Sequence, residues 1–135
     1  MIQIDTSFLL ALAQPQDALH ARASAWAKVL TEPLLVTEYV LWETINSLSK
    51  PVDRPRAHLL VRHVRSTRNY QFVPASGELF DAGLRLHAER QDKEWSLTDC
   101  ISFLVMQEQG ITRALTHDHH FEQAGFEALL RRDPP

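Results

Sequence analysis

The sequence predicts an α/β domain with a mainly parallel central sheet flanked by helices, and three observations lead to this fold class. Short apolar segments typical of strands alternate with longer segments that have helical periodicity. The length of 135 residues suits one domain, and a hydrophobic content of 44% can fill one core. No internal repeat, low-complexity segment or linker interrupts the sequence. We therefore expect residues 1–135 to form a single domain.

The first part of the chain contains two strand candidates and three helix candidates. The expected elements are a strand at 1–5, helices at 7–13 and 16–32, a strand at 34–37 and a helix at 37–49. In the second helix Leu19, Ala23 and Trp26 fall on one face, which favours packing on a sheet. The prolines of "PVDRP" end the last helix, because proline lacks an amide donor and restricts the residue before it.

The second part of the chain continues the alternation. The expected elements are a helix at 56–68, a strand at 70–75, helices at 76–91 and 95–110, a strand at 111–116, a short helix at 118–125 and an edge strand at 126–130. The helix "WSLTDCISFLVMQEQ" is strongly apolar and stops at Gly110, so we expect it to be central. Trp95 lies in the polar stretch "QDKEWS" and is expected to be partly exposed.

Composition excludes several classes of protein. The single cysteine, Cys100, rules out an internal disulfide and a thiolate metal cluster, and it fits a reducing cytoplasm. No apolar run approaches the roughly 18 residues of a membrane span, so we expect no membrane association. The four glycines form neither a dinucleotide-binding loop nor a P-loop, and no G-x-S-x-G motif is present.

Four carboxylates are predicted to meet at one edge of the sheet. Asp5 ends the first strand, Asp118 follows the fourth, and the carboxyl ends of parallel strands share an edge. Asp99 lies in the first turn of the apolar helix, and Glu43 lies six residues after the end of the second strand, about 9 Å along a helix. The hydroxyl groups expected nearby belong to Thr6, Ser7, Thr98 and Thr116.

Each acid also has an ordinary structural interpretation. Asp99 follows Ser96 by three residues, which is the spacing of a capping box, and Asp118 suits the N-cap of the short helix. Asp5 suits a turn and Glu43 a solvated helix. The convergence of four acids favours a site, because crowded carboxylates repel unless they hold protons or bind cations. Oxygen ligands select hard ions, so Mg²⁺ or Mn²⁺ is the expected cofactor.

The acid motifs resemble those of the PIN-domain nucleases, and among them the VapC-like toxin ribonucleases of toxin–antitoxin pairs. The resemblance runs from Ile2 to Leu130. Its motifs are "IDTSFLLAL" with Asp5, "TEYVLWETINSL" with Glu43, "WSLTDCISFLVM" with Asp99 and "LTHDHHF" with Asp118. The order and spacing of the four motifs make the resemblance specific.

The resemblance implies a three-layer PIN-like sandwich and a Mg²⁺- or Mn²⁺-dependent endoribonuclease. Asp5 and Asp99 would be the main metal ligands, and Glu43 and Asp118 would complete the catalytic site. Some relatives carry a further acid where this chain has Ser96, which leaves one or two metal ions possible. The resemblance also implies an RNA substrate, a cognate antitoxin protein and a homodimer.

Two other groups of residues attract attention. Five arginines and one acid lie between Asp53 and Arg68, although the whole chain carries a net charge of -3. Arg62 and Arg65 share a helical face and could bind RNA phosphates, but a solvated helix or an antitoxin contact is also open. The run "HDHH" at 117–120 suggests a transition-metal site. Because these histidines straddle a turn, we expect them to be surface polar residues.

Rival functions make different demands on the sequence. A phosphotransfer receiver domain also has an aspartate after its first strand, but it needs a lysine late in the chain, and none follows Lys93. A PIN-like binding module without strong catalysis is expected to lack an acid, and all four are present. A PIN nuclease of RNA processing, outside any toxin–antitoxin pair, stays open as the alternative.

Overall fold

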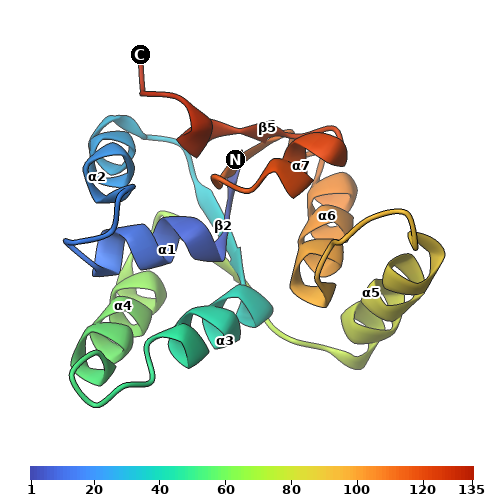
Figure 1. Ribbon diagram of the computed structural model, residues 1–135, viewed down its shortest axis with the longest axis horizontal. Coiled ribbons are helices and arrows are strands. Elements are labelled where there is room, and N and C mark those ends of the chain that lie inside the picture. The colour runs from blue at the N-terminus through green and yellow to red at the C-terminus, as the bar shows by residue number, and fades with distance from the viewer.

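The computed structural model describes residues 1–135, and it confirms the predicted α/β fold with a parallel sheet (Figure 1). The strands are β1 (Ile2–Ile4), β2 (Leu34–Thr37), β3 (Tyr70–Val73), β4 (Arg113–Leu115) and β5 (Glu127–Ala128). The helices are α1 (Thr6–Ala13), α2 (His20–Val29), α3 (Glu38–Ser47), α4 (Arg54–Ser66), α5 (Gly77–Glu89), α6 (Leu97–Gln109) and α7 (His119–Gln123), followed by the 3₁₀ turn η1 (Leu129–Arg131).

The five strands form one sheet in the order β3-β2-β1-β4-β5, and every pair is parallel. The chain moves outward from β1 to β3 in one direction and then returns to β4 on the other side of β1. The strand order therefore reverses between β1 and β4. In open α/β sheets, ligands bind beyond the carboxyl ends of the strands at such a switch point.

Two layers of helices cover the sheet, which gives the predicted three-layer sandwich. One apolar cluster joins Ile2, Ile4 and Val36 to residues of α1, α2, α3 and α4. The other joins Leu35 and Ala114 to residues of α5, α6 and α7. Figure 1 shows α1, α2 and α4 on one side of the strands and α5 and α6 on the other. Successive strand residues point to opposite faces, which explains why β2 contributes to both clusters.

Several elements differ from the sequence prediction by a few residues at their ends, among them α2, α4 and β5. The second helix begins at His20 instead of residue 16, because the Asp17 side chain accepts a hydrogen bond from the Leu19 amide and forms a turn. Helix α4 begins two residues earlier than expected, since Pro55 fits the first turn of a helix. The last strand is only two residues long, and the chain turns into η1 at Leu129.

The prediction for Trp95 is wrong, because this side chain is buried. Its ring packs edge-on against Phe103, with centroids 4.9 Å apart, and its indole N–H donates to Gln123. The Arg90 guanidinium covers the ring at 4.7 Å. Arg90 and Gln123 therefore cover a core position that a polar sequence context conceals. Separately, no helix is long and apolar enough to cross a membrane.

Candidate functional site

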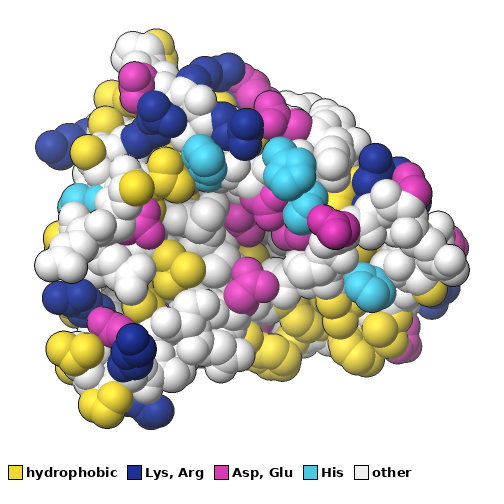
Figure 2. Space-filling model, viewed as in Figure 1, with side chains coloured by type: hydrophobic (Ala, Val, Ile, Leu, Met, Phe, Trp, Pro, Cys, Tyr) yellow, Lys and Arg dark blue, Asp and Glu magenta, His cyan; other side chains and the backbone are white.

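A solvent-open cleft of about 420 Å³ lies at the switch point of the sheet. Its lining residues come from the ends of β1 and β4 and from α1, α3, α6, α7 and the loop before α6; they are Asp5, Thr6, Ser7, Leu10, Glu43, Ser47, Glu94, Ser96, Asp99, Asp118 and His120. Figure 2 shows acidic side chains around a hollow near the centre of this face, with histidine side chains beside them. All four carboxylates expected from the sequence line this cleft.

Asp5 is the most deeply buried of these acids, with 5% of its surface exposed. It lies between β1 and α1, and its Oδ2 accepts hydrogen bonds from Thr116 Oγ1 at 2.7 Å and from Ser7 Oγ at 3.0 Å. Burial, together with the charge of Asp99, raises the pKa of Asp5 to about 6, although the hydrogen bonds from Thr116 and Ser7 act in the opposite direction. The Thr116 bond ties the end of β4 to the end of β1.

Asp99 is both a capping residue and part of the acidic cleft. Its Oδ2 accepts from the Ser96 amide at 3.1 Å while Ser96 Oγ accepts from the Asp99 amide at 3.0 Å, so the predicted capping box is present. Burial raises the pKa of Asp99, and the neighbouring charge of Asp118 adds to this effect. The two interpretations of Asp99 left open by the sequence are therefore compatible.

Asp118 and Glu43 lie on the outer parts of the cleft. Asp118 Oδ1 accepts from the His120 amide at 2.9 Å, which makes Asp118 the N-cap of α7 as expected. The Asp118 amide donates to Thr116 Oγ1 at 3.0 Å. Glu43 is half-buried on α3, while Leu41 and Leu48 turn into the core. The carboxylate of Glu43 faces the cleft because it lies off the apolar stripe.

The four hydroxyl groups predicted near the acids do not behave alike. Thr116 and Ser7 hold Asp5, and Thr6 lines the cleft with a buried hydroxyl that has no hydrogen-bond partner. Thr98 is half-buried on α6 and is not among the lining residues. Thr98 therefore points away from the cleft that Asp99 lines, because adjacent residues in a helix are rotated by about 100°.

Two ionisable residues of the cleft were missed by the sequence analysis. Glu94 adds a fifth carboxylate from the loop before α6, two residues before Ser96. His120 was expected at the surface, but its side chain is only 17% exposed and its Nδ1 lies 3.2 Å from Asp118 Oδ1 and 3.4 Å from Asp99 Oδ2. One sequence feature could have indicated that His120 lies near the acids. It follows Asp118 by two residues, in the first turn of a helix that Asp118 caps.

Arg62 and Arg65 lie outside the cleft on α4. Both are exposed, and neither forms an ion pair, whereas Arg56 on the same helix lies 3.9 Å from Asp53. Arg65 borders a groove between α3 and α4 together with Trp42 and His58. The two guanidinium groups are therefore accessible to a dissolved partner.

The chemistry of the cleft follows from its donors. Its five carboxylates offer oxygen atoms only; the charge of Asp99 raises the pKa of Asp5, and the charge of Asp118 raises the pKa of Asp99. This combination fits a hard divalent cation, which relieves the repulsion that the fold imposes. The one nitrogen donor in the lining, His120, lies at the Asp118 end.

Comparisons with known proteins identify the family of this chain. The family model of the PIN domain matches residues 2–127. The 23S rRNA-specific endonuclease VapC20 from two strains of Mycobacterium tuberculosis is 31% identical over 128 residues, covering 93% of this chain and 95% of the relative.

Two solved structures share the fold. The crystal structure of Mycobacterium tuberculosis VapC20, a sarcin–ricin loop cleaving toxin, matches with a TM-score of 0.86 and 26% identity, covering 93% of this chain and 96% of that one. FitAcB from Neisseria gonorrhoeae matches with a TM-score of 0.66 and 18% identity over 95% of both chains, a likeness of fold alone.

Proposed function

The chain belongs to the PIN-domain family, in its VapC-like branch of toxin ribonucleases, and on this premise we propose that its acidic cleft hydrolyses RNA phosphodiester bonds with a divalent metal ion. One observation carries this proposal. Carboxylates from four separate segments, Asp5, Glu43, Asp99 and Asp118, line a single cleft at the switch point of the sheet.

We propose that Asp5 and Asp99 are the main ligands of Mg²⁺ or Mn²⁺, and that Glu43 and Asp118 complete the site. The all-oxygen donor set and the raised pKa of both buried aspartates support a hard cation. When bound, such an ion lowers the pKa of a coordinated water and stabilises the charge on the leaving oxygen. Glu94, on the exposed edge of the cleft, is a candidate for the further acid that some relatives carry near Ser96.

The protein contributes by holding its acids in place before any substrate arrives. The hydroxyl groups of Thr116 and Ser7 direct Asp5 Oδ2, and the Ser96 amide directs Asp99 Oδ2. Each bond favours the ionised carboxylate, and so it opposes the protonation that burial alone would cause. The cleft is open to solvent, which leaves space for a phosphodiester to reach both aspartates.

The substrate and partners are proposed from the relatives. VapC20 is named for 23S rRNA, so we propose ribosomal RNA as the substrate class of this protein and its sarcin–ricin loop as the first sequence to test. We also propose a cognate antitoxin as partner, a homodimer as the assembly and the cytoplasm as the location. The exposed groove between α3 and α4, with Trp42 at its edge, supports binding to another protein.

The test is cleavage of 23S rRNA by the purified protein with and without divalent ions. We expect cleavage with Mg²⁺ or Mn²⁺, none after removal of metal with a chelator, and recovery when Mg²⁺ is returned. A preparation of Asp5→Asn purified in parallel controls for contaminating nuclease. Cleavage that persists in the chelated wild type but not in this control would contradict the metal-dependent mechanism.

A further inference from the structure

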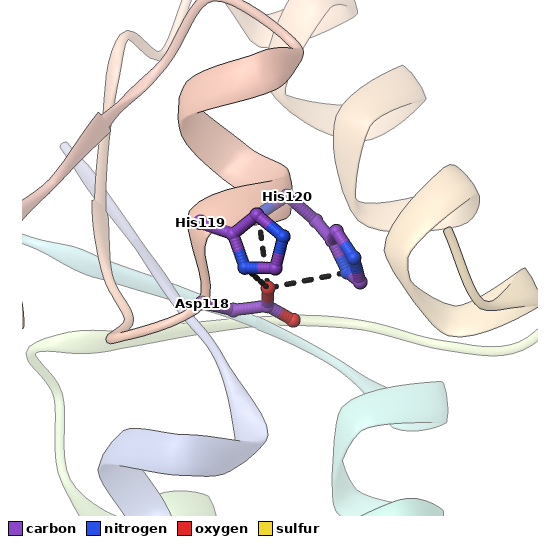
Figure 3. Close-up of side chains that lie close together, drawn as sticks. All are labelled: Asp118, His119 and His120. Carbon is purple, nitrogen blue, oxygen red and sulfur yellow. Dashed lines mark hydrogen bonds and ion pairs between the residues drawn. The ribbon is translucent and has the colours of Figure 1, made fainter. Parts of the chain in front are cut away.

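A cluster of mixed nitrogen and oxygen donors lies at one end of the acidic cleft. The side chains of Asp118, His119 and His120 place one donor atom each within 4.8 Å of one another. Asp118 Oδ1 lies 3.2 Å from His120 Nδ1 and 3.7 Å from His119 Nδ1. Figure 3 shows both imidazole rings next to the carboxylate, and their centroids are 4.4 Å apart.

The two separations between Asp118 Oδ1 and the imidazole nitrogens are close to the edge length of a tetrahedral metal site. Zinc binds nitrogen and carboxylate oxygen at roughly 2.0–2.2 Å, so two ligand atoms of a tetrahedral ion lie about 3.3–3.5 Å apart. Asp99 Oδ2 supplies a fourth donor, 3.4 Å from His120 Nδ1. Three donor separations in the cluster thus bracket the expected value, and a small rotation of the exposed His119 ring would close the longest one.

The donors are partly arranged in advance. The Asp118 carboxylate is fixed by the bond that its Oδ1 accepts from the His120 amide. His120 Nδ1 is buried and has no hydrogen-bond partner, so in the imidazole tautomer that carries its proton on Nε2 this nitrogen can bind an ion. His119 is 60% exposed, so most of its ring is in contact with solvent. The cluster therefore consists of two partly buried donors beside an exposed third one.

The donor types select a different ion from the one proposed for the main site. Imidazole suits zinc and other late first-row metals, whereas Mg²⁺ prefers oxygen ligands. We propose that Asp118, His119 and His120 bind Zn²⁺ at the edge of the cleft, with Asp99 as the fourth donor. Because Asp99 and Asp118 also line the proposed Mg²⁺ site, Zn²⁺ bound here inhibits RNA cleavage. This inhibition rests on the proposed function, whereas the binding of Zn²⁺ does not.

Binding is tested first with Co²⁺ as a spectroscopic probe of the Zn²⁺ site. Tetrahedral Co²⁺ absorbs visible light far more strongly than octahedral Co²⁺, so the spectrum of the metal-free protein with one equivalent of Co²⁺ reports the geometry. We expect an intense tetrahedral band that one equivalent of Zn²⁺ removes. His119→Gln and His120→Gln should each weaken Zn²⁺ binding by at least about tenfold in calorimetry, because each removes a ligand.

The matched control is His117→Gln, which changes an exposed histidine of the same loop that lies outside the cluster. Its Zn²⁺ affinity should equal that of wild type. Unfolding followed by circular dichroism identifies any variant that has lost its structure, and the exposed His119 provides a substitution that leaves the core intact. Zn²⁺ affinity unchanged in both His119→Gln and His120→Gln would overturn the proposal and leave the histidines as partners of the carboxylates.

RNA cleavage provides the second measurement. With saturating Mg²⁺, Zn²⁺ should inhibit wild type, and the concentration for half inhibition should rise at least about tenfold in His119→Gln relative to that variant's own uninhibited rate. Inhibition that does not depend on the histidines would mean that Zn²⁺ replaces Mg²⁺ at the aspartates, which also overturns the proposal. A tetrahedral, histidine-dependent Co²⁺ spectrum in a protein that cleaves no RNA would uphold the zinc site and contradict the ribonuclease function.

Discussion

The acidic cleft and helix α4 are both strongly charged, but they hold their charges in different ways. Asp5 and Asp99 are 5% and 7% exposed and are fixed by hydrogen bonds from hydroxyl and amide groups. Arg62 and Arg65 are exposed on α4 and form no ion pair. The acidic cleft thus holds negative charges close together in a buried position, whereas α4 carries positive charges that are exposed to water.

The difference predicts how each region responds to change. Burial raises the pKa of Asp5 and Asp99, so neutralising one of them alters both the metal site and the stability of the fold. Exposed arginines are screened by salt, and each contributes a small amount that adds to the others. A single substitution in the cleft should therefore abolish most of the RNA cleavage, whereas each substitution on α4 should weaken RNA binding by a small amount.

The largest effect is expected for Asp99→Asn. Asparagine keeps an oxygen that accepts from the Ser96 amide, so the helix cap survives while the charge is lost. If Asp99 is a metal ligand as proposed, its loss should lower the rate of RNA cleavage more than about 100-fold, since changes in the shell around metal ligands already cost 10- to 100-fold. The rate at saturating Mg²⁺ is the measurement, and Asp81→Asn on the exposed face of α5 is the matched control.

Thermal unfolding of the same variant separates its two roles. If Asp99 acts mainly through the helix dipole, Asp99→Asn should lower the stability by about 0.3–1 kcal/mol with or without Mg²⁺. If the cleft confines like charges, the metal-free variant should melt higher than metal-free wild type and gain little from Mg²⁺. A variant that melts lower without metal, is stabilised by Mg²⁺ and cleaves RNA would contradict the acidic-site assignment.

The next effect concerns Asp5 and pH. The pKa of Asp5 is about 6 in the folded protein and about 3.8 in the unfolded chain, so between these values the folded state binds more protons. The stability that Asp5 contributes is therefore complete below about pH 4 and is lost as the pH rises through 6. A shift of this size corresponds to at most about 3 kcal/mol.

The measurement is the free energy of unfolding of metal-free wild type and Asp5→Asn from pH 4.5 to 8, a range chosen to bracket the pKa of about 6. The advantage of the variant over wild type should grow with pH and level off above pH 7. Saturating Mg²⁺ should reverse the advantage, because only wild type binds the ion well. A constant difference across this range would show that Asp5 does not titrate in it.

Much of the fold could be predicted because its elements have local signals. The strand at 34–37 has the predicted bounds, and Gly110 ends α6 with a positive φ of 68°, as a helix-ending glycine should. The start of α2 and the burial of Trp95 were predicted wrongly, because both depend on side-chain contacts. The Asp17 turn delays α2, and the burial of Trp95 requires Arg90 and Gln123 from other segments.

Only those site residues that directly follow a strand could be placed from the sequence. Asp5 and Asp118 follow adjacent parallel strands, so their convergence could be inferred without coordinates. Glu94 and His120 could not be assigned, because a loop and the direction of a short helix decide where their side chains point. Thr98 was misplaced for a related reason, since neighbouring helical residues face different directions.

The smallest effect is expected on α4, where the small change in RNA binding can be measured. If Arg62 or Arg65 contacts an RNA phosphate, its replacement by alanine should reduce the slope of log K against log salt by about 0.7 for a single strand and about 0.9 for a duplex. The loss of affinity should be similar for all RNA sequences, because phosphate contacts carry no base information.

The slopes are best measured in the Asp99→Asn background, where cleavage is expected to be too slow to degrade the RNA during the titration. Arg85→Ala is the matched control, because Arg85 is an exposed arginine on α5, on the opposite side of the sheet from α4. The double variant of Arg62 and Arg65 should show the sum of the two single changes, since exposed contacts that share no partner are additive. Slopes equal to that of the control in both single variants would assign these arginines to solvent or to contact with a partner protein.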